Sequence, residues 1–117
     1  MDNYLDVLRH ELEADDESFL IKMRIELEWD REAFSRVTEA MRIYCDQHTE
    51  GDVLERWVAS GFYYFSWAVK DWTTHPNFPR PYPKEYYDNA YQRLFDLCCY
   101  FFDGTSPYGA GAGFEPV

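Results

Sequence analysis

The side chains that could carry acid–base chemistry or bind a metal are too scattered to form a recognisable site. His10, His48 and His75 are far apart in the 117-residue chain, and none follows a glutamate at the three-residue spacing of a helical metal motif. Asp71 and His75 have the four-residue spacing that two ligands on one helix face need, but Pro76 follows and ends the helix there. We therefore expect no metal and no other cofactor.

The cysteines make no better case for an enzyme. Cys98 and Cys99 are adjacent, so on a helix their side chains point about 100° apart and do not converge on one ion. A reactive thiolate needs an electropositive, accessible setting, which the following Tyr100 and Phe101 do not indicate. We predict buried, apolar cysteines and no catalytic activity. With no disulfide framework and no visible export signal, a cytoplasmic location is expected.

The glycine-rich end of the chain is only superficially like a phosphate-binding loop. The GAGAG motif at 109–113 follows a predicted helix instead of a strand, opens no helix and has no lysine after it. We therefore expect a helical domain over 1–103 and an irregular tail over 104–117, pinned by Tyr108 or Phe114.

Carboxylates dominate the charge of the chain and are unevenly placed. The net charge is −11; residues 1–52 hold fifteen acids and six bases (net −9), and residues 53–117 hold seven acids and five bases (net −2). This balance argues against nucleic acid or an anionic membrane as a direct partner and suits a basic protein, although solubility alone would also explain it. The candidate partner-binding acids are Glu26, Glu28, Asp30 and Glu32.

An aromatic, proline-rich stretch is the other candidate surface. Residues 73–83 contain four prolines, which fix φ and remove backbone donors, so we predict a stiff extended connection. In one interpretation it packs over the end of the helices, with Phe78 and Tyr82 as plugs. In the other, this stretch and its aromatic neighbours anchor an interface, because Tyr and Trp are common energetic hot spots. The candidate anchors are Trp72, Phe78, Tyr82 and Tyr86.

The elements that would position these residues are helices. Apolar residues recur at helical spacing over 2–13, 31–48 and 85–102. Asp30 is a predicted N-cap for the second of these helices, and Gly104 a predicted end for the third.

Residues 19–29 are ambiguous between helix and strand. Apolar residues at every second position from 21 to 29 alternate with charged ones, which is a strand pattern. Oppositely charged pairs at four-residue spacing, such as Lys22–Glu26, favour a helix, and no second strand candidate is available for pairing. We predict a helix that is kinked or broken near Asp30.

The stretch 53–72 is the element around which we expect the others to pack. It carries no charge from Trp57 to Val69 and is apolar nearly all round, as a helix buried by its neighbours would be. Asp52 is its predicted N-cap, and Gly61, among bulky residues, predicts the close approach of another helix. The expected fold is an all-α bundle of four or five helices with this aromatic helix at its centre. Any interface should then lie on the acidic helices before it and the proline-rich stretch after it.

Residues 75–108 resemble a class of bacterial proteins. HPNF (75–78), EYYDNAYQRLFDLCCYFF (85–102) and DGTSPY (103–108) look like the C-terminal half of small acidic helical proteins encoded beside bacterial toxins. These are the immunity proteins of polymorphic-toxin and contact-dependent-inhibition systems. The whole chain is also similar in kind to the helical immunity proteins of nuclease colicins. The resemblance implies a protein that binds a cognate toxin domain, often a basic nuclease, and blocks its active site or a neighbouring surface. It carries over no individual binding residue.

Two functional hypotheses follow. The first is a non-enzymatic acidic binding protein, an immunity protein that binds and neutralises a basic toxin domain. The alternative is a structural protein whose aromatic helix completes its burial in a homodimer, without a toxin partner.

Overall fold

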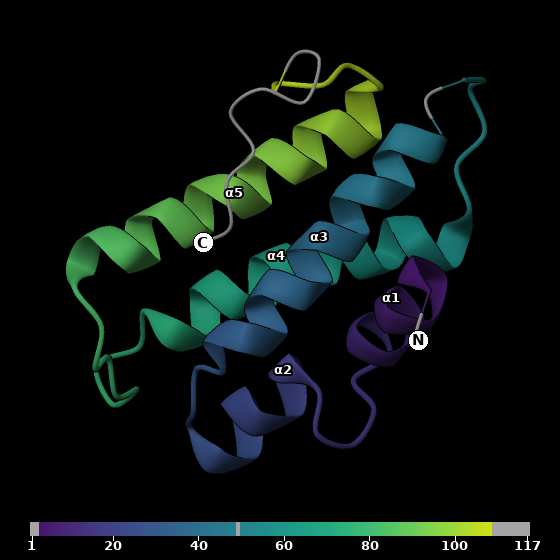
Figure 1. Ribbon diagram of the computed structural model, residues 1–117. Helices are drawn as coiled ribbons and strands as arrows, with labels where there is room; N and C mark the ends of the chain where they lie inside the picture. Colours follow the sequence, from purple (N-terminus) through teal and green to yellow (C-terminus); the bar gives the residue numbers. More distant parts are fainter. Residues whose placement is uncertain (1–2, 49, 109–117) are drawn as a thin grey trace.

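A computed structural model describes residues 3–48 and 50–108, and the regular elements within them are all helices (Figure 1). The predicted all-α bundle is confirmed. The elements are α1 (Tyr4–Leu12), α2 (Phe19–Ile21), the π-helix η1 (Lys22–Glu26), α3 (Arg31–Gln47), α4 (Arg56–Thr73) and α5 (Lys84–Asp103). The GAGAG motif and Phe114 lie outside the described residues.

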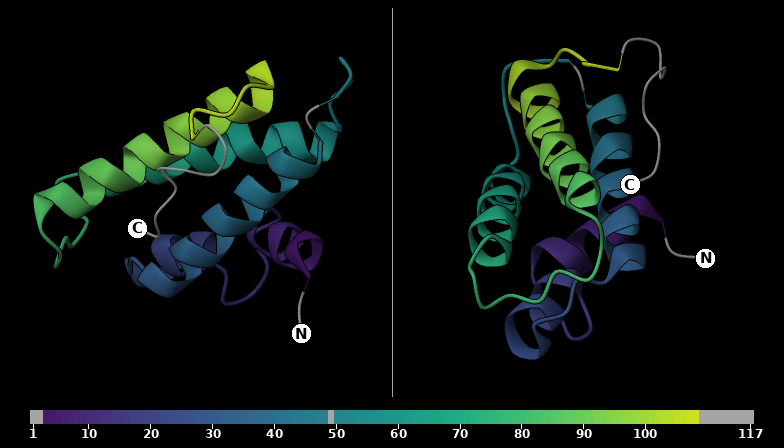
Figure 2. Two further views of the ribbon diagram at one scale, coloured as in Figure 1. Left: turned by 45° about the horizontal axis from the view of Figure 1, so that its top comes forward. Right: turned by 90° about the vertical axis from the view of Figure 1, so that its left-hand side faces the viewer.

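The helices pack so that α5 lies between α3 and α4, while α1 packs across α3 and also contacts α4 (Figures 1 and 2). The short α2 and η1 lie at one end of the bundle, where η1 contacts α4. The connection from α4 to α5 runs past this same end.

Side chains and glycines fix the helix ends largely as the sequence predicts. Asp30 begins α3, and its Oδ1 accepts a hydrogen bond from the Ala33 amide at 3.1 Å. Gly104 ends α5 with a φ of 78°, which a residue without Cβ adopts easily, and its amide donates to the Tyr100 carbonyl at 2.8 Å. Tyr108 is buried, as expected of a residue that pins the chain after α5.

The ambiguous stretch 19–29 is helical but not regular. After α2 the chain continues directly into the π-helix η1, and Leu27 then takes a left-handed conformation with a φ of 53°. Met23 and Trp29 are buried, whereas Ile25 and Leu27 are exposed, so the alternating apolar residues do not share one face. The strand pattern is therefore misleading, and the predicted break before α3 is confirmed.

The core is built from large aromatic and aliphatic side chains, among them the fully buried Phe19, Phe34, Phe65 and Tyr87. One buried carboxylate belongs to it. Glu11 Oε1 accepts the Phe19 amide at 2.8 Å, which joins α1 to the start of α2. The pKa of Glu11 lies above its ordinary value. Burial raises it most, and the hydrogen bond from Phe19 and the nearby His10 offset only part of that effect.

The aromatic helix differs from its prediction in two respects. It begins at Arg56 and not at Val53, and Asp52 does not cap it. The Glu55 carboxylate accepts hydrogen bonds from Tyr44 Oη at 2.8 Å and Trp57 Nε1 at 3.1 Å, which holds the preceding chain extended and leaves Val53 93% exposed. Its outer side is also uncovered, so α4 is buried on one side only.

Uncovered residues on α4 and α5 correct two expectations. Tyr63 and Trp67 are exposed on α4, so the aromatic helix is not surrounded by its neighbours as expected. Cys98 and Cys99 on α5 are half-buried, and Cys98 lines a hollow beside the uncovered side of α4; Cys45 is buried. Among the described helices, none combines the length and apolar character needed to cross a bilayer.

Gly61 is a point of close approach between α4 and α1, and the sequence predicts the close approach of another helix there. A Cβ at this position would lie 2.6 Å from Leu12 Cδ1 and 3.0 Å from Leu12 Cβ. The Leu12 Cβ is tied directly to the backbone of the chain at the end of α1, so the helices would have to separate.

We predict that Gly61→Ala destabilises the protein by about 1 kcal/mol. Alanine improves helix propensity by about 1 kcal/mol, but overpacking against Leu12 costs about 1–3 kcal/mol. Urea unfolding followed by far-UV circular dichroism measures the difference. Ser60→Ala, at the exposed preceding position, is the control and should be neutral or slightly stabilising. A Gly61→Ala protein as stable as Ser60→Ala would disprove the close approach.

Candidate protein-binding site

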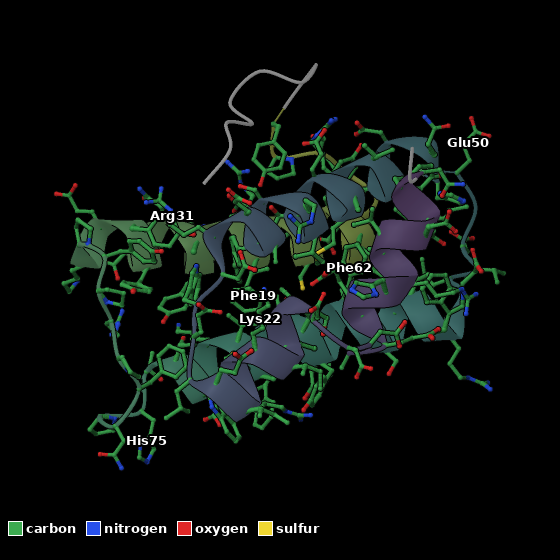
Figure 3. The ribbon with its side chains drawn as sticks, turned by 60° about the horizontal axis from the view of Figure 1, so that its bottom comes forward. Phe19, Lys22, Arg31, Glu50, Phe62 and His75 are labelled. Carbon is green, nitrogen blue, oxygen red and sulfur yellow. The ribbon has the colours of Figure 1, made fainter. Side chains whose placement is uncertain are left out.

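The predicted partner-binding residues gather at the end of the molecule where η1 meets the α4–α5 connection. In Figure 3 His75, on the α4–α5 connection, lies at one end of the molecule, and Glu50 lies at the opposite end. Trp72 and Phe78 line one pocket there together with Leu27, and Glu26 and Glu28 are the chain neighbours of Leu27. The remaining predicted residues, Asp30, Glu32, Tyr82 and Tyr86, lie outside that pocket.

The pocket has a volume of about 330 Å³ and mainly apolar walls. Leu27 contributes one wall from the turn after η1, and Trp72 contributes another from the last turn of α4. These two side chains are 42% and 40% exposed. Phe78 is buried, so it closes the pocket and cannot be a protruding anchor. The other lining residues are Asp71, His75 and Asn77.

Leu27 is a site residue that the sequence pattern does not reveal. Its place in an alternating apolar run suggests burial, yet the left-handed backbone turns it to the surface. A non-glycine residue in this conformation costs about 1–2 kcal/mol, so its surroundings must hold it there. Such distortions within helices, including single π-turns, occur often at functional sites.

Contacts on both sides hold the Leu27 turn. The amides of Leu27 and Glu28 both donate to the Lys22 carbonyl, the second at 3.2 Å. Lys22 Nζ then pairs with Asp30 Oδ2 at 2.8 Å, across the base of the turn. Because Asp30 also caps α3, one carboxylate fixes the turn and the helix that follows it.

Trp29 anchors the same turn in the core. Its indole packs edge to face against Phe19 and Tyr87, with ring centroids 5.0 and 5.1 Å away. Its Nε1 donates a hydrogen bond to Tyr86 Oη at 2.8 Å, so the buried indole keeps a polar partner. Tyr86 is thus primarily a support for the turn.

Tyr82 and Tyr86 also form a small cluster with Arg31, whose guanidinium carbon lies 4.8 and 4.3 Å from their ring centroids. The proline-rich connection therefore packs over the end of the bundle, as the plug interpretation proposes for Phe78 and Tyr82. Glu32 is exposed in the first turn of α3, where the helix dipole favours an acid.

Asp71 lines the pocket, and the exposed Glu26 and Glu28 lie on either side of its lining residue Leu27 in the chain. We call these three acids the acidic rim. Neither glutamate forms an ion pair within the part of the chain that the structure describes, whereas the nearby Lys22 is paired with Asp30. Carboxylates beside an apolar pocket suit a side chain with an apolar stem and a positive end.

His75 completes the rim. Its Nδ1 accepts the Asn77 amide at 3.2 Å, so in the neutral ring the proton is on Nε2. In the described residues, no group of three or more His, Cys, Asp or Glu side chains has the arrangement of a metal site.

No protein-family model matches this chain, and neither a curated protein nor a solved structure matches it. The site therefore rests on its own geometry.

We predict that the charge of Asp30 stabilises the Leu27 turn at neutral pH and ceases to do so in acid. Burial raises the pKa of Asp30, but hydrogen bonds from Lys22 and Ala33 and the charge of Lys22 together outweigh that effect. The pKa therefore lies below its ordinary value of 3.8. A group whose pKa falls on folding contributes stability above its unfolded pKa and loses it as the pH falls through the folded pKa.

Two variants separate the charge of Asp30 from its capping role. Asp30→Asn keeps the cap and removes the charge, whereas Asp30→Ala should lose about 1 kcal/mol more through the missing cap. The stability deficit of Asp30→Asn should be present at pH 7 and shrink below pH 3.8 in urea titrations. A deficit that is unchanged by acid would contradict this account of the turn.

Proposed function

We propose that the chain is a non-enzymatic binding protein that takes a basic protein domain at the Leu27–Trp72 pocket. The partner implied by the resemblance of residues 75–108 is a bacterial toxin domain, which would make the chain an immunity protein acting in the cytoplasm. The observation that carries the proposal is the apolar pocket between Leu27 and Trp72, which has Asp71 in its lining and Glu26 and Glu28 next to Leu27 in the chain.

The chemistry of this pocket suits lysine or arginine from a partner. Both side chains have an aliphatic stem, which can lie along Leu27 and Trp72, and a charged end that reaches Asp71 or Glu28. Trp is among the residues that most often dominate binding energy at interfaces, particularly where the surroundings exclude water. The pocket is therefore a plausible centre of an interface, with the acids as its rim.

The wider charge distribution supports the same partner class. The net charge of −9 on residues 1–52 produces a negative field around the turn that carries Glu26 and Glu28. Such a field speeds the approach of a basic domain and makes the association rate fall with salt. Speed matters for an immunity protein, because its partner must be blocked before it acts.

We predict that Trp72→Ala weakens binding to the cognate toxin by about 30-fold, the loss of roughly 2 kcal/mol that is typical of a hot spot. The candidate toxin to be tested is the product of the neighbouring open reading frame, and its activity is measured against increasing amounts of this protein. Val53→Ser, which alters an exposed apolar residue outside the pocket, is the control and should leave protection unchanged.

The acidic rim is tested with a matched pair of charge reversals. Glu26→Lys/Glu28→Lys should slow association and reduce its salt dependence, whereas Glu50→Lys/Asp52→Lys makes the same change in net charge at the opposite end and should have a smaller effect. If the toxin stays fully active with an excess of the wild-type protein, the proposal is wrong. If both reversals act equally, the acids do not form a local rim.

A further inference from the structure

A second surface with a different character lies along the outer side of α4 and α5. Two hollows meet there and share Lys70, Tyr91 and Phe95. One has a volume of about 310 Å³ and lies beside the aromatic side chains, and the other, of about 500 Å³, extends toward the start of α5. Together they form the α4–α5 groove, which shares no lining residue with the Leu27–Trp72 pocket.

The first half of the groove is apolar and open. Four aromatic side chains with 47–67% exposure line it: Tyr63, Trp67, Phe95 and Phe102. Ser66 and Cys98 lie between the helices, with Ser66 Oγ 3.1 Å from Cys98 Sγ. Ordinary surfaces expose single apolar residues, whereas a contiguous aromatic group of this kind marks an interaction site.

The second half of the groove is basic, although the protein as a whole is strongly acidic. Its charged lining residues are three bases, Lys70, Arg80 and Lys84, and one acid, Asp88. Asp88 Oδ2 is paired with Lys84 Nζ at 2.7 Å. Arg80 lies over the ring of Tyr87 at 4.4 Å, which holds its charge at this end of the groove. The local excess is therefore two positive charges.

We propose that the α4–α5 groove binds an acidic amphipathic helix of another protein. Apolar side chains of that helix would cover Trp67 and Phe95, and carboxylates at one of its ends would meet Lys70 and Arg80. The occupant is argued from charge complementarity: a basic end beside an aromatic face selects a segment that is apolar along one side and acidic at one end.

The dimensions of the groove fit a single helix. Lys84 and Phe102 bound it on α5, and at about 1.5 Å per residue they lie about 27 Å apart along the helix, the length of a partner helix of about 18 residues. Aromatic side chains present about 150–250 Å² each, so the four exposed rings offer about 400–500 Å². This is roughly half of one side of a standard protein interface, enough for one segment.

A second copy of the chain is the competing occupant, and the charges disfavour it. A two-fold pair would place the groove against itself. The carboxylates that pair with the bases of one groove would then have to come from the same groove of the second copy. Its one lining acid, Asp88, is already paired with Lys84. A basic toxin domain is disfavoured at this surface for the same electrostatic reason.

The test is selection from a displayed library of random peptides of about 18 residues, with the full-length protein as bait and Trp67→Ser as counter-bait. The recovered peptides should carry apolar residues at three- and four-residue spacing and acids concentrated toward one end. Trp67→Ser should weaken the tightest peptide by about 30-fold, as the loss of a hot spot does. Lys70→Glu should weaken it by about tenfold, and Arg36→Glu, an exposed change on α3, should have little effect.

Three results would overturn the proposal. The recovered peptides could be basic or show no charge preference, or their affinity could be unaffected by both Trp67→Ser and Lys70→Glu. The wild-type protein could also form a dimer that persists on dilution in light scattering and is lost in Trp67→Ser, which would make the occupant a second copy. Circular dichroism of each variant checks that it is folded, and failure of the toxin assay would not affect this test, since the two surfaces use different residues.

Discussion

The burial of Trp29 is the interaction on which the rest of the structure depends. Its ring packs against Phe19 from α2, Phe34 from α3 and Tyr87 from α5, and its Nε1 donates to Tyr86 Oη. Removing a buried Trp side chain typically costs about 3–5 kcal/mol, a large share of the stability of a small domain. Because Trp29 lies two residues after Leu27, its burial also determines where that exposed, left-handed residue is held.

The two sides of α4 divide the molecule by charge. On one side Trp72 meets the Leu27 turn and its carboxylates; on the other Trp67 lies in a groove whose charged residues are mainly bases. A net charge of −11 conceals this division, because most of the excess acid belongs to the first 52 residues. Partners of opposite charge could therefore occupy the protein together without competing for the same residues.

The sequence predicts much of the fold because local signals agree with tertiary packing. Asp30 and Gly104 act as the expected helix ends, and Gly61 marks the contact with α1. Prediction is less successful where packing is decided by distant residues. Apolar content alone suggests that α4 is surrounded, but α3 packs mainly on α1 and α5 and leaves Trp67 uncovered.

The candidate site was only half visible in the sequence. Trp72 and the acids of 26–32 stand out by type and spacing. Leu27 does not, because it belongs to an alternating apolar pattern that predicts burial, and the π-helix η1 breaks that pattern. No local preference favours a left-handed leucine, so that conformation depends on tertiary contacts such as those of Lys22, Asp30 and Trp29 on either side of it.

The most direct test of the pocket as a binding site is a nuclear magnetic resonance titration of the isotope-labelled protein with the proposed toxin partner. The four tryptophans give four indole N–H signals, which report separate parts of the molecule. The account predicts that the Trp72 indole and the Leu27 amide shift on complex formation, while the indole of Trp67 changes little. A complex that forms while the Trp72 and Leu27 signals stay in place would contradict it.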